Sequence, residues 1–134
     1  LTLDAFKECN KTIQDNDILI LGISYKPDVK DIQLTPAKHI IEKLQKLGAN
    51  VHIYDPYFSS GQVFDINVEE NLDDIISKVD ASIIVTGHKE FKKIEPSFFN
   101  QMKGSILIDT RGIIDPEDAK KAKLIFRGLG RGKL

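Results

Sequence analysis

The stretch Asp17-Ile-Leu-Ile-Leu-Gly-Ile-Ser24 (residues 17–24) decides the fold. It is a short apolar run bounded by polar residues and containing a glycine, a pattern typical of a strand buried on both faces of a parallel sheet. Thr35 and Pro36 predict an N-cap and a first helical residue for a helix over residues 36–47, and residues 51–54 are predicted to form a second strand. Strand, helix and strand in this order make a βαβ unit with a right-handed crossover.

The alternation of helices and strands continues to the end of the chain. Asn67 and Glu70 form the pattern of a capping box ahead of a helix that carries apolar residues at 72–79. Further elements are predicted at residues 81–86 (strand), 96–102 (helix), 105–109 (strand), 116–123 (helix) and 124–126 (strand). The pattern predicts an α/β fold with a three-layer, doubly wound, mainly parallel sheet of the Rossmann-like kind. Residues 1–16 are expected to be a connecting arm from a preceding domain, and residues 17–134 a single domain.

The composition is that of an ordinary globular protein. Of the 134 residues 41% are apolar and 29% are charged, which excludes a disordered chain. The net charge of -1 gives no field that attracts a polyanion, so nucleic acid is not an expected partner. The apolar runs are far shorter than the ~20 residues of a membrane span, and no signal-peptide pattern opens the chain. With its single cysteine, Cys9, the chain is expected to be cytoplasmic and without a membrane partner.

In an open parallel sheet, ligands bind beyond the carboxyl ends of the strands. The loop after the first predicted strand lacks the G-x-G-x-x-G motif, so the chain is not expected to bind NAD by itself. It offers Lys26, next to Tyr25, and a cation at a strand end ahead of a helix suits a phosphate. The alternative is a solvated lysine that pairs with Asp28 or Asp31.

Two further residues are expected at the same edge. Arg111 follows the strand predicted over 105–109, and arginine binds phosphate through two parallel hydrogen bonds. A local pair between Arg111 and Asp109 is an equally good interpretation. His88 follows the strand predicted over 81–86 and is a candidate donor to a ligand hydroxyl or phosphate; a surface histidine without a role is the alternative.

Other reactive side chains carry weaker signals. Asp55 closes the second predicted strand and is interpreted as a structural turn residue. His39 and His52 share no ligand spacing with His88 or Cys9, so no metal site is predicted. Cys9 lies in a polar stretch without a partner base, so no catalytic residue is predicted in this chain.

Several motifs resemble the signature of one enzyme family. Gly22-Ile-Ser-Tyr-Lys-Pro-Asp-Val-Lys-Asp31, followed by Thr35-Pro-Ala37, is similar to the G-L-x-[FY]-K-x-[DN]-x-x-D-x-R-x-S-P-A signature of the UDP-glucose/GDP-mannose dehydrogenase family. Val51-His-Ile-Tyr-Asp-Pro56 is similar to the family's V-x-x-Y-D-P, and Ile108-Asp-Thr-Arg-Gly112 to its late D-x-R motif. Together these motifs cover about residues 17–112 and correspond to the family's C-terminal, UDP-binding domain.

The resemblance extends to a branch of the family. His88-Lys-Glu-Phe91 and Arg127-Gly-Leu-Gly-Arg-Gly132 look more like the enzymes that oxidise N-acetylated sugars, especially UDP-N-acetylmannosamine, than like those that oxidise UDP-glucose. The family oxidises the sugar C6 alcohol to a carboxylate while NAD takes two hydrides. Its NAD is held mainly by an N-terminal domain and its reactive cysteine lies in the preceding domains, so this chain alone is predicted to be inactive. The implied partners are a UDP-sugar, the N-terminal and central helical domains, and further copies in a homo-oligomer.

The resemblance also assigns roles at individual positions. Tyr25 and Lys26 would contact the UDP pyrophosphate, and Arg111 would face the cleft between the domains. Gln33 stands where the signature has arginine, so a contact to the NAD phosphates at this cofactor-side position would be weaker. A UDP-glucose 6-dehydrogenase domain and a stand-alone, non-catalytic nucleotide- or CoA-binding regulatory domain are the alternatives. A signalling receiver is disfavoured because Lys26 follows the first strand where a receiver has an acidic pair.

Overall fold

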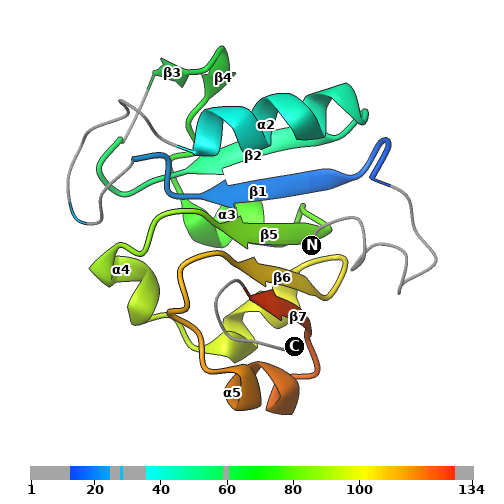
Figure 1. Cartoon of the computed structure of the whole chain (residues 1–134), viewed down its shortest axis with the longest axis vertical. Coiled ribbons are helices and arrows are strands. Elements are labelled where there is room, and N and C mark those ends of the chain that lie inside the picture. Colours follow the sequence, from blue (N-terminus) through cyan, green and yellow to red (C-terminus); the bar gives the residue numbers. More distant parts are fainter. Residues whose placement is uncertain (1–12, 25–27, 29–35, 59–60, 129–134) are drawn as a thin grey trace.

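The structure is a computed structural model, and it describes residues 13–24, 28, 36–58 and 61–128. A five-stranded sheet with the order β2-β1-β5-β6-β7 forms the centre, and all its neighbouring strands are parallel (Figure 1). The strands are β1 (Asp17–Leu21), β2 (Asn50–Tyr54), β5 (Ala81–Ile84), β6 (Ile106–Asp109) and β7 (Ile125–Gly128). A small antiparallel hairpin of β3 (Gln62–Val63) and β4 (Ile66–Asn67) lies next to β2.

Helices cover both faces of the sheet. They are α2 (Ala37–Lys46), α3 (Leu72–Ile76), α4 (Lys89–Lys92), the 3-10 helix η1 (Pro96–Gln101) and α5 (Pro116–Lys121). On one face, the apolar side chains of α2 pack with Ile18 and Ile20 of β1. On the other, buried side chains of α3, α4, η1 and α5 pack with Leu19 and Leu21. Successive side chains of a strand point to opposite faces, so the continuous apolar run of β1 contributes to both cores and the three-layer fold is confirmed.

The order of the strands places a switch point between β1 and β5. From β1 the chain crosses through α2 to β2 on one side, and later continues through β5, β6 and β7 on the other. At this point the backbones approach closely. Gly22 has a φ of 89°, and a Cβ added to it would lie 2.5 Å from the Cβ of Thr86. Only glycine fits here, because other residues rarely adopt such a positive φ and because any side chain would collide with Thr86.

Most of the predicted elements are present with ends that differ by one to three residues, but the capping box at Asn67 is wrong. Asn67 is the last residue of β4, and Asn71 is the N-cap of α3, where its side chain accepts a hydrogen bond of 2.9 Å from the backbone N–H of Asp73. Both are asparagines ahead of the same apolar face, so the pattern suited either position. Pro36, predicted as the first residue of α2, is instead its N-cap, and the helix begins at Ala37. Thr35, the predicted N-cap, lies outside the described residues, as do residues 1–12 of the predicted arm.

The hairpin and the short helix α4 were not predicted. The hairpin turns at Phe64 and Asp65, which have φ values of 53° and 64°. Two positive φ values in a two-residue turn normally call for Asn-Gly or Asp-Gly, so Phe-Asp gives no signal for such a turn. α4 has only four residues, too few for a periodic apolar pattern.

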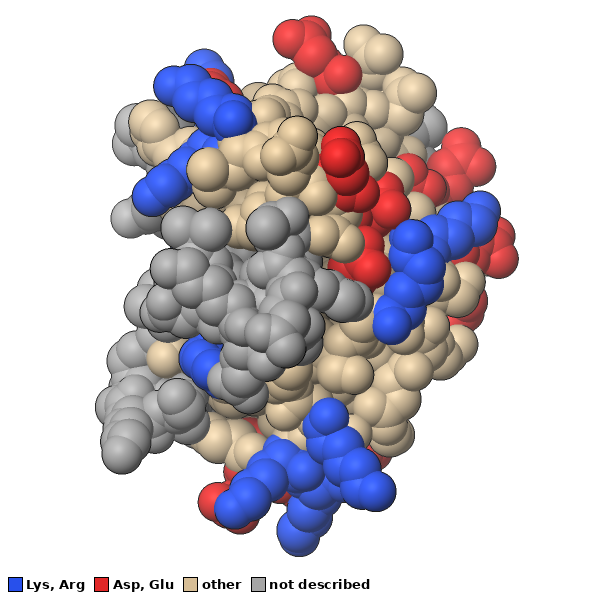
Figure 2. Space-filling model, turned by 90° about the vertical axis from the view of Figure 1, so that its right-hand side faces the viewer, with Lys and Arg blue, Asp and Glu red and all other residues tan. Residues whose placement is uncertain are grey.

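A polar cluster lies at the edge where the strands begin. Figure 2 views this edge and shows acidic and basic side chains next to one another. Asp17 Oδ1 lies 3.0 Å from His52 Nε2, and Asp17 Oδ2 lies 3.3 Å from Lys103 Nζ. Burial raises the pKa of Asp17, but the hydrogen bonds from His52 and Lys103 together with their charges outweigh it, so the pKa lies below its ordinary value.

The lowered pKa of Asp17 predicts a pH-dependent contribution to stability. A carboxylate whose pKa is lower in the folded than in the unfolded chain stabilises the fold above the unfolded pKa, and this stabilisation is lost as the pH falls through the folded pKa. Asp17→Asn is therefore expected to reduce the free energy of unfolding by about 1 kcal/mol at neutral pH and by much less at about pH 3. Urea unfolding at both pH values measures the difference.

Asp15→Asn is the matched control, because Asp15 is exposed and asparagine tolerates its φ of 65°. It removes the same charge two residues away and is expected to leave the stability nearly unchanged at both pH values. An equal loss for Asp17→Asn at neutral and acidic pH would contradict the assignment.

Within the described residues, no helix is long and apolar enough to cross a membrane.

Candidate functional site

Three of the loops that leave the sheet at the edge where the strands end form the candidate site. They begin at Gly22 after β1, at Val85 after β5 and at Thr110 after β6, and the parallel strands bring them to one edge (Figure 1). The switch point between β1 and β5 lies within this edge. In open α/β sheets this is the place where ligands bind.

Hydroxyl groups tie the three loops together. Thr86 Oγ1 donates a hydrogen bond of 2.6 Å to the carbonyl oxygen of Ser24, and Thr110 Oγ1 donates one of 2.6 Å to that of Ile84. The backbone N–H of Val85 donates to the carbonyl of Leu21 at 2.9 Å. Ser24 and Thr86 are fully buried, so the bond between these two residues is sheltered from water and gives this part of the edge a defined shape.

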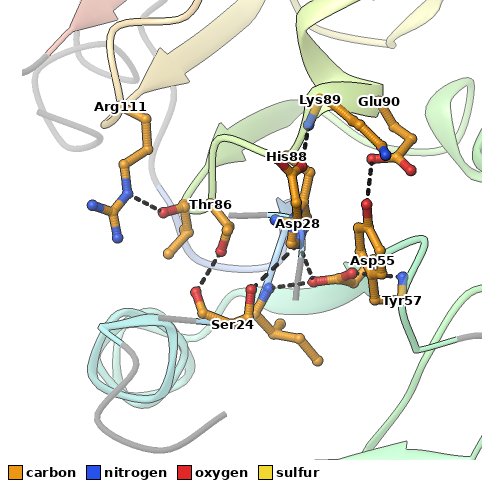
Figure 3. A network of polar contacts seen from close by, with 11 residues as sticks. Ser24, Asp28, Asp55, Tyr57, Thr86, His88, Lys89, Glu90 and Arg111 are labelled. Atoms are coloured by element: carbon orange, nitrogen blue, oxygen red, sulfur yellow. Dashed lines mark hydrogen bonds and ion pairs between the residues drawn. The ribbon is translucent and has the colours of Figure 1, made fainter. Parts of the chain in front are cut away.

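His88 is buried beneath this edge. Its side chain is 0% exposed, its Nε2 lies 2.9 Å from Asp55 Oδ2, and its Nδ1 accepts a hydrogen bond of 2.7 Å from the backbone N–H of Asp28 (Figure 3). Because an N–H donates to Nδ1, that nitrogen carries no proton, and Nε2 must be the donor to Asp55. A direct contact between His88 and a ligand, which the sequence suggested, would require one of these two bonds to break.

Asp55 holds the loops that follow β1, β2 and β5. The residue is 1% exposed, and besides His88 its carboxylate accepts from the backbone N–H groups of Ile23 and Tyr57 at 2.9 and 2.8 Å. The sequence identified Asp55 as structural, and the geometry agrees. What the sequence missed is its reach to His88, which no local pattern signals because 33 residues separate the two.

Arg111 lies at the same edge, after β6. Its side chain is exposed, and its Nε donates a hydrogen bond of 2.7 Å to the carbonyl oxygen of Val85 (Figure 3). Its backbone N–H donates to Oδ1 of the buried Asp109, which also accepts from Gly112 and, through Oδ2, from Ile114. The Asp109 carboxylate therefore shapes the loop through backbone bonds, while the Val85 carbonyl fixes the guanidinium beside the switch point.

Three of the predicted site residues, Tyr25, Lys26 and Gln33, lie outside the described residues. Ser24 and Asp28 come before and after Tyr25 and Lys26 in the sequence, and both lie at this edge. Both contact His88, from which they are 60 or more residues away in the sequence. Among the residues that the structure describes, no group of three or more His, Cys, Asp or Glu side chains is arranged to hold a metal ion.

A hollow of about 780 Å³ lies elsewhere, between the hairpin and α3. Its lining includes Glu69, Glu70 and Asp74 with the single cation Lys78. Three carboxylates around one ammonium group disfavour an anionic ligand. For a phosphate-bearing ligand, the edge that carries Arg111 is the better site.

Comparison of the sequence with known proteins points to one enzyme family. Residues 19–116 match the UDP binding domain of the UDP-glucose/GDP-mannose dehydrogenase family. The chain is 31% identical over 133 residues to the UDP-N-acetyl-D-mannosamine dehydrogenase of Pyrococcus horikoshii, which covers 98% of this chain and 29% of that protein. It is 30% identical over 125 residues to the UDP-glucose 6-dehydrogenase TuaD of Bacillus subtilis, which covers 90% and 27%.

A solved structure gives the same result. The structure of UDP-D-ManNAc dehydrogenase from Pyrococcus horikoshii superposes with a TM-score of 0.85 at 30% identity, and the match covers 100% of this chain and 30% of that one. The chain therefore spans less than a third of the length of the relatives that it matches.

Proposed function

Because the chain belongs to the UDP-glucose/GDP-mannose dehydrogenase family, we propose that it is the part of an NAD-dependent nucleotide-sugar 6-dehydrogenase that holds the UDP end of the substrate. The proposed substrate is UDP-N-acetylmannosamine, oxidised to its uronate, as the name of the archaeal relative suggests. UDP-glucose is the second candidate, since the Bacillus relative is nearly as similar.

The observation that carries the proposal is the position of Arg111. Its Nε bond to Val85 holds a guanidinium group at the end of β5, next to the switch point. A guanidinium stays charged at any relevant pH and its planar fork matches the oxygens of a phosphate. Tyr25 and Lys26 follow β1 in the sequence, and β1 forms the other side of the switch point. We propose that Lys26 and Arg111 bind the diphosphate together and that Tyr25 lines it.

The described residues do not fit the pyrophosphate of NAD. A dinucleotide site of the Rossmann kind uses glycines so that the pyrophosphate can approach the backbone. At Gly22, the glycine at the end of β1, the space left by the missing side chain is already filled by Thr86. A Cβ added to Gly22 would lie 2.5 Å from the Cβ of Thr86. The cofactor is therefore proposed to bind mainly to another domain, with Gln33 on its side of the cleft. The chain alone is proposed to be inactive.

Binding of UDP tests the proposal. Lys26→Ala and Arg111→Ala are each expected to weaken binding about 10- to 100-fold, the effect of losing a charge-assisted hydrogen bond to phosphate. Arg111→Lys keeps the charge but loses the fork, so an intermediate loss is expected. Isothermal titration calorimetry at high UDP concentration measures the affinities.

Lys43→Ala is the control for the loss of a cation. Lys43 is exposed in the last turn of α2 and does not belong to the loops at the ends of the strands. This variant is expected to bind UDP as the parent does. Equal affinities in all four variants and the parent would reject the site, and a parent chain that binds no UDP would reject the function.

A further inference from the structure

The geometry points to a positioning role for His88: it holds residue 28, in the loop after β1, in place for nucleotide binding, and does so through the backbone N–H of Asp28 rather than by touching the ligand. This inference rests on the proposed function. Four polar residues, Ser24, Asp28, Asp55 and His88, form what we call the loop clasp (Figure 3).

The loop clasp grips the β1 loop from both neighbouring strands. β1 lies between β2 and β5 in the sheet. Asp55, after β2, accepts the backbone N–H of Ile23 on one side, and His88, after β5, accepts that of Asp28 on the other. Ile23 and Asp28 flank the positions of Tyr25 and Lys26, so the bonds fix the backbone on either side of these two residues.

Residue 28 shows the effect of this grip. Asp28 has a φ of 62°, a left-handed conformation that costs free energy for a residue with a side chain. Two bonds to the β5 loop hold it there. Its N–H donates to His88 Nδ1 at 2.7 Å, and its Oδ1 accepts from the backbone N–H of Lys89 at 2.7 Å. The backbone turn at 28 therefore depends on residues 88 and 89.

Asp55 determines which nitrogen of His88 carries the proton. Its carboxylate accepts a hydrogen bond from Nε2–H, so the proton stays on Nε2 and Nδ1 is able to accept from the backbone N–H of Asp28. The opposite tautomer would set an N–H against the N–H of Asp28. The rings of Tyr57 and Phe91 pack against the imidazole at centroid distances of 4.7 and 5.5 Å and hold its plane. The roles of His88 as donor to Asp55 and acceptor from Asp28 follow from this one proton.

Two substitutions separate the two bonds of His88. His88→Gln can place an amide N–H where Nε2 donates to Asp55, but it leaves no acceptor for Asp28. His88→Asn can place its oxygen where Nδ1 accepts from Asp28, but it no longer donates to Asp55. Asparagine is the smaller residue and leaves the larger cavity, so a purely structural role predicts that His88→Asn is the worse variant in every respect. Positioning through Asp28 predicts that His88→Gln binds UDP more weakly.

We expect His88→Gln to lose about tenfold in UDP affinity and His88→Asn to lose less, although His88→Asn has the lower melting temperature. Calorimetry and thermal unfolding on the same samples give both quantities. Affinities that follow the melting temperatures, or that equal the parent's in both variants, overturn the inference while leaving the proposed function intact. A parent chain that binds no UDP overturns both.

A second pair of variants avoids the core. Asp28 is exposed, and Asp28→Gly tolerates the positive φ but removes the acceptor for Lys89. Asp28→Asn keeps an acceptor oxygen and also tolerates this φ. UDP affinity is expected to fall several-fold in Asp28→Gly and less in Asp28→Asn. The same affinity in both contradicts the positioning role even if neither variant of His88 folds.

Discussion

Gly22→Ala is expected to reduce the free energy of unfolding by about 3 kcal/mol. An alanine at a φ of 89° is strained, and its Cβ would lie 2.5 Å from Thr86 Cβ and 2.9 Å from the Thr86 backbone nitrogen. Real Cβ atoms do not approach this closely, so the ends of β1 and β5 must move apart. The Thr86 bond to Ser24 lies at this point and would be disturbed with them.

Gly61→Ala isolates the contribution of the backbone. Gly61 also has a φ of 89°, but none of the residues that the structure describes lies within 4 Å of an added Cβ. Only the strain remains, so a loss of about 1 kcal/mol is expected. Chemical denaturation of the two variants and the parent gives the comparison. Equal losses at positions 22 and 61 would show that the close approach to Thr86 is unimportant.

Asp55→Ala is expected to reduce the free energy of unfolding by about 3 to 5 kcal/mol, or to prevent folding. The carboxylate is buried and accepts from Ile23 N, Tyr57 N and His88 Nε2, so its removal leaves two buried donors and one part-buried donor without this acceptor. Leaving a buried donor unpaired costs more than the bond contributed.

Asp115→Ala is the matched control for this loss. Asp115 is the N-cap of α5, where its exposed carboxylate accepts one hydrogen bond of 2.8 Å from Glu117 N. Loss of such a cap costs about 1 kcal/mol. If Asp55→Ala were no more destabilising than Asp115→Ala in denaturant unfolding, the three-way role of Asp55 would be wrong.

The fold could be predicted because its signals are local. The apolar run of β1 and the amphipathic α2 each lie within about ten residues, and a parallel sheet follows from their alternation. The hairpin was missed because Phe64 and Asp65 adopt positive φ values that their types do not announce. The N-cap was misplaced because two asparagines precede the same helix, and Asn67 is paired with Gln62 in the hairpin while Asn71 is the cap.

The candidate site could be predicted only in its outline. The ends of parallel strands share an edge, so the sequence placed the positions after β1, β5 and β6 together. It did not predict that His88 is buried, since a histidine in the polar stretch after a strand looks exposed. The bonds of His88 to Asp28 and Asp55 join residues 60 and 33 positions apart, and such pairs arise from the folded topology alone.

A nucleoside diphosphate is expected to bind at the edge where the strands end. Titration of the isotope-labelled chain with UDP, followed by the backbone amide signals, tests it most directly. The predicted result is that the shifts concentrate at residues 22–28, 85–89 and 110–113. Shifts concentrated instead around Asp17, His52 and Lys103 at the opposite edge, or in the acidic hollow next to α3, would contradict it.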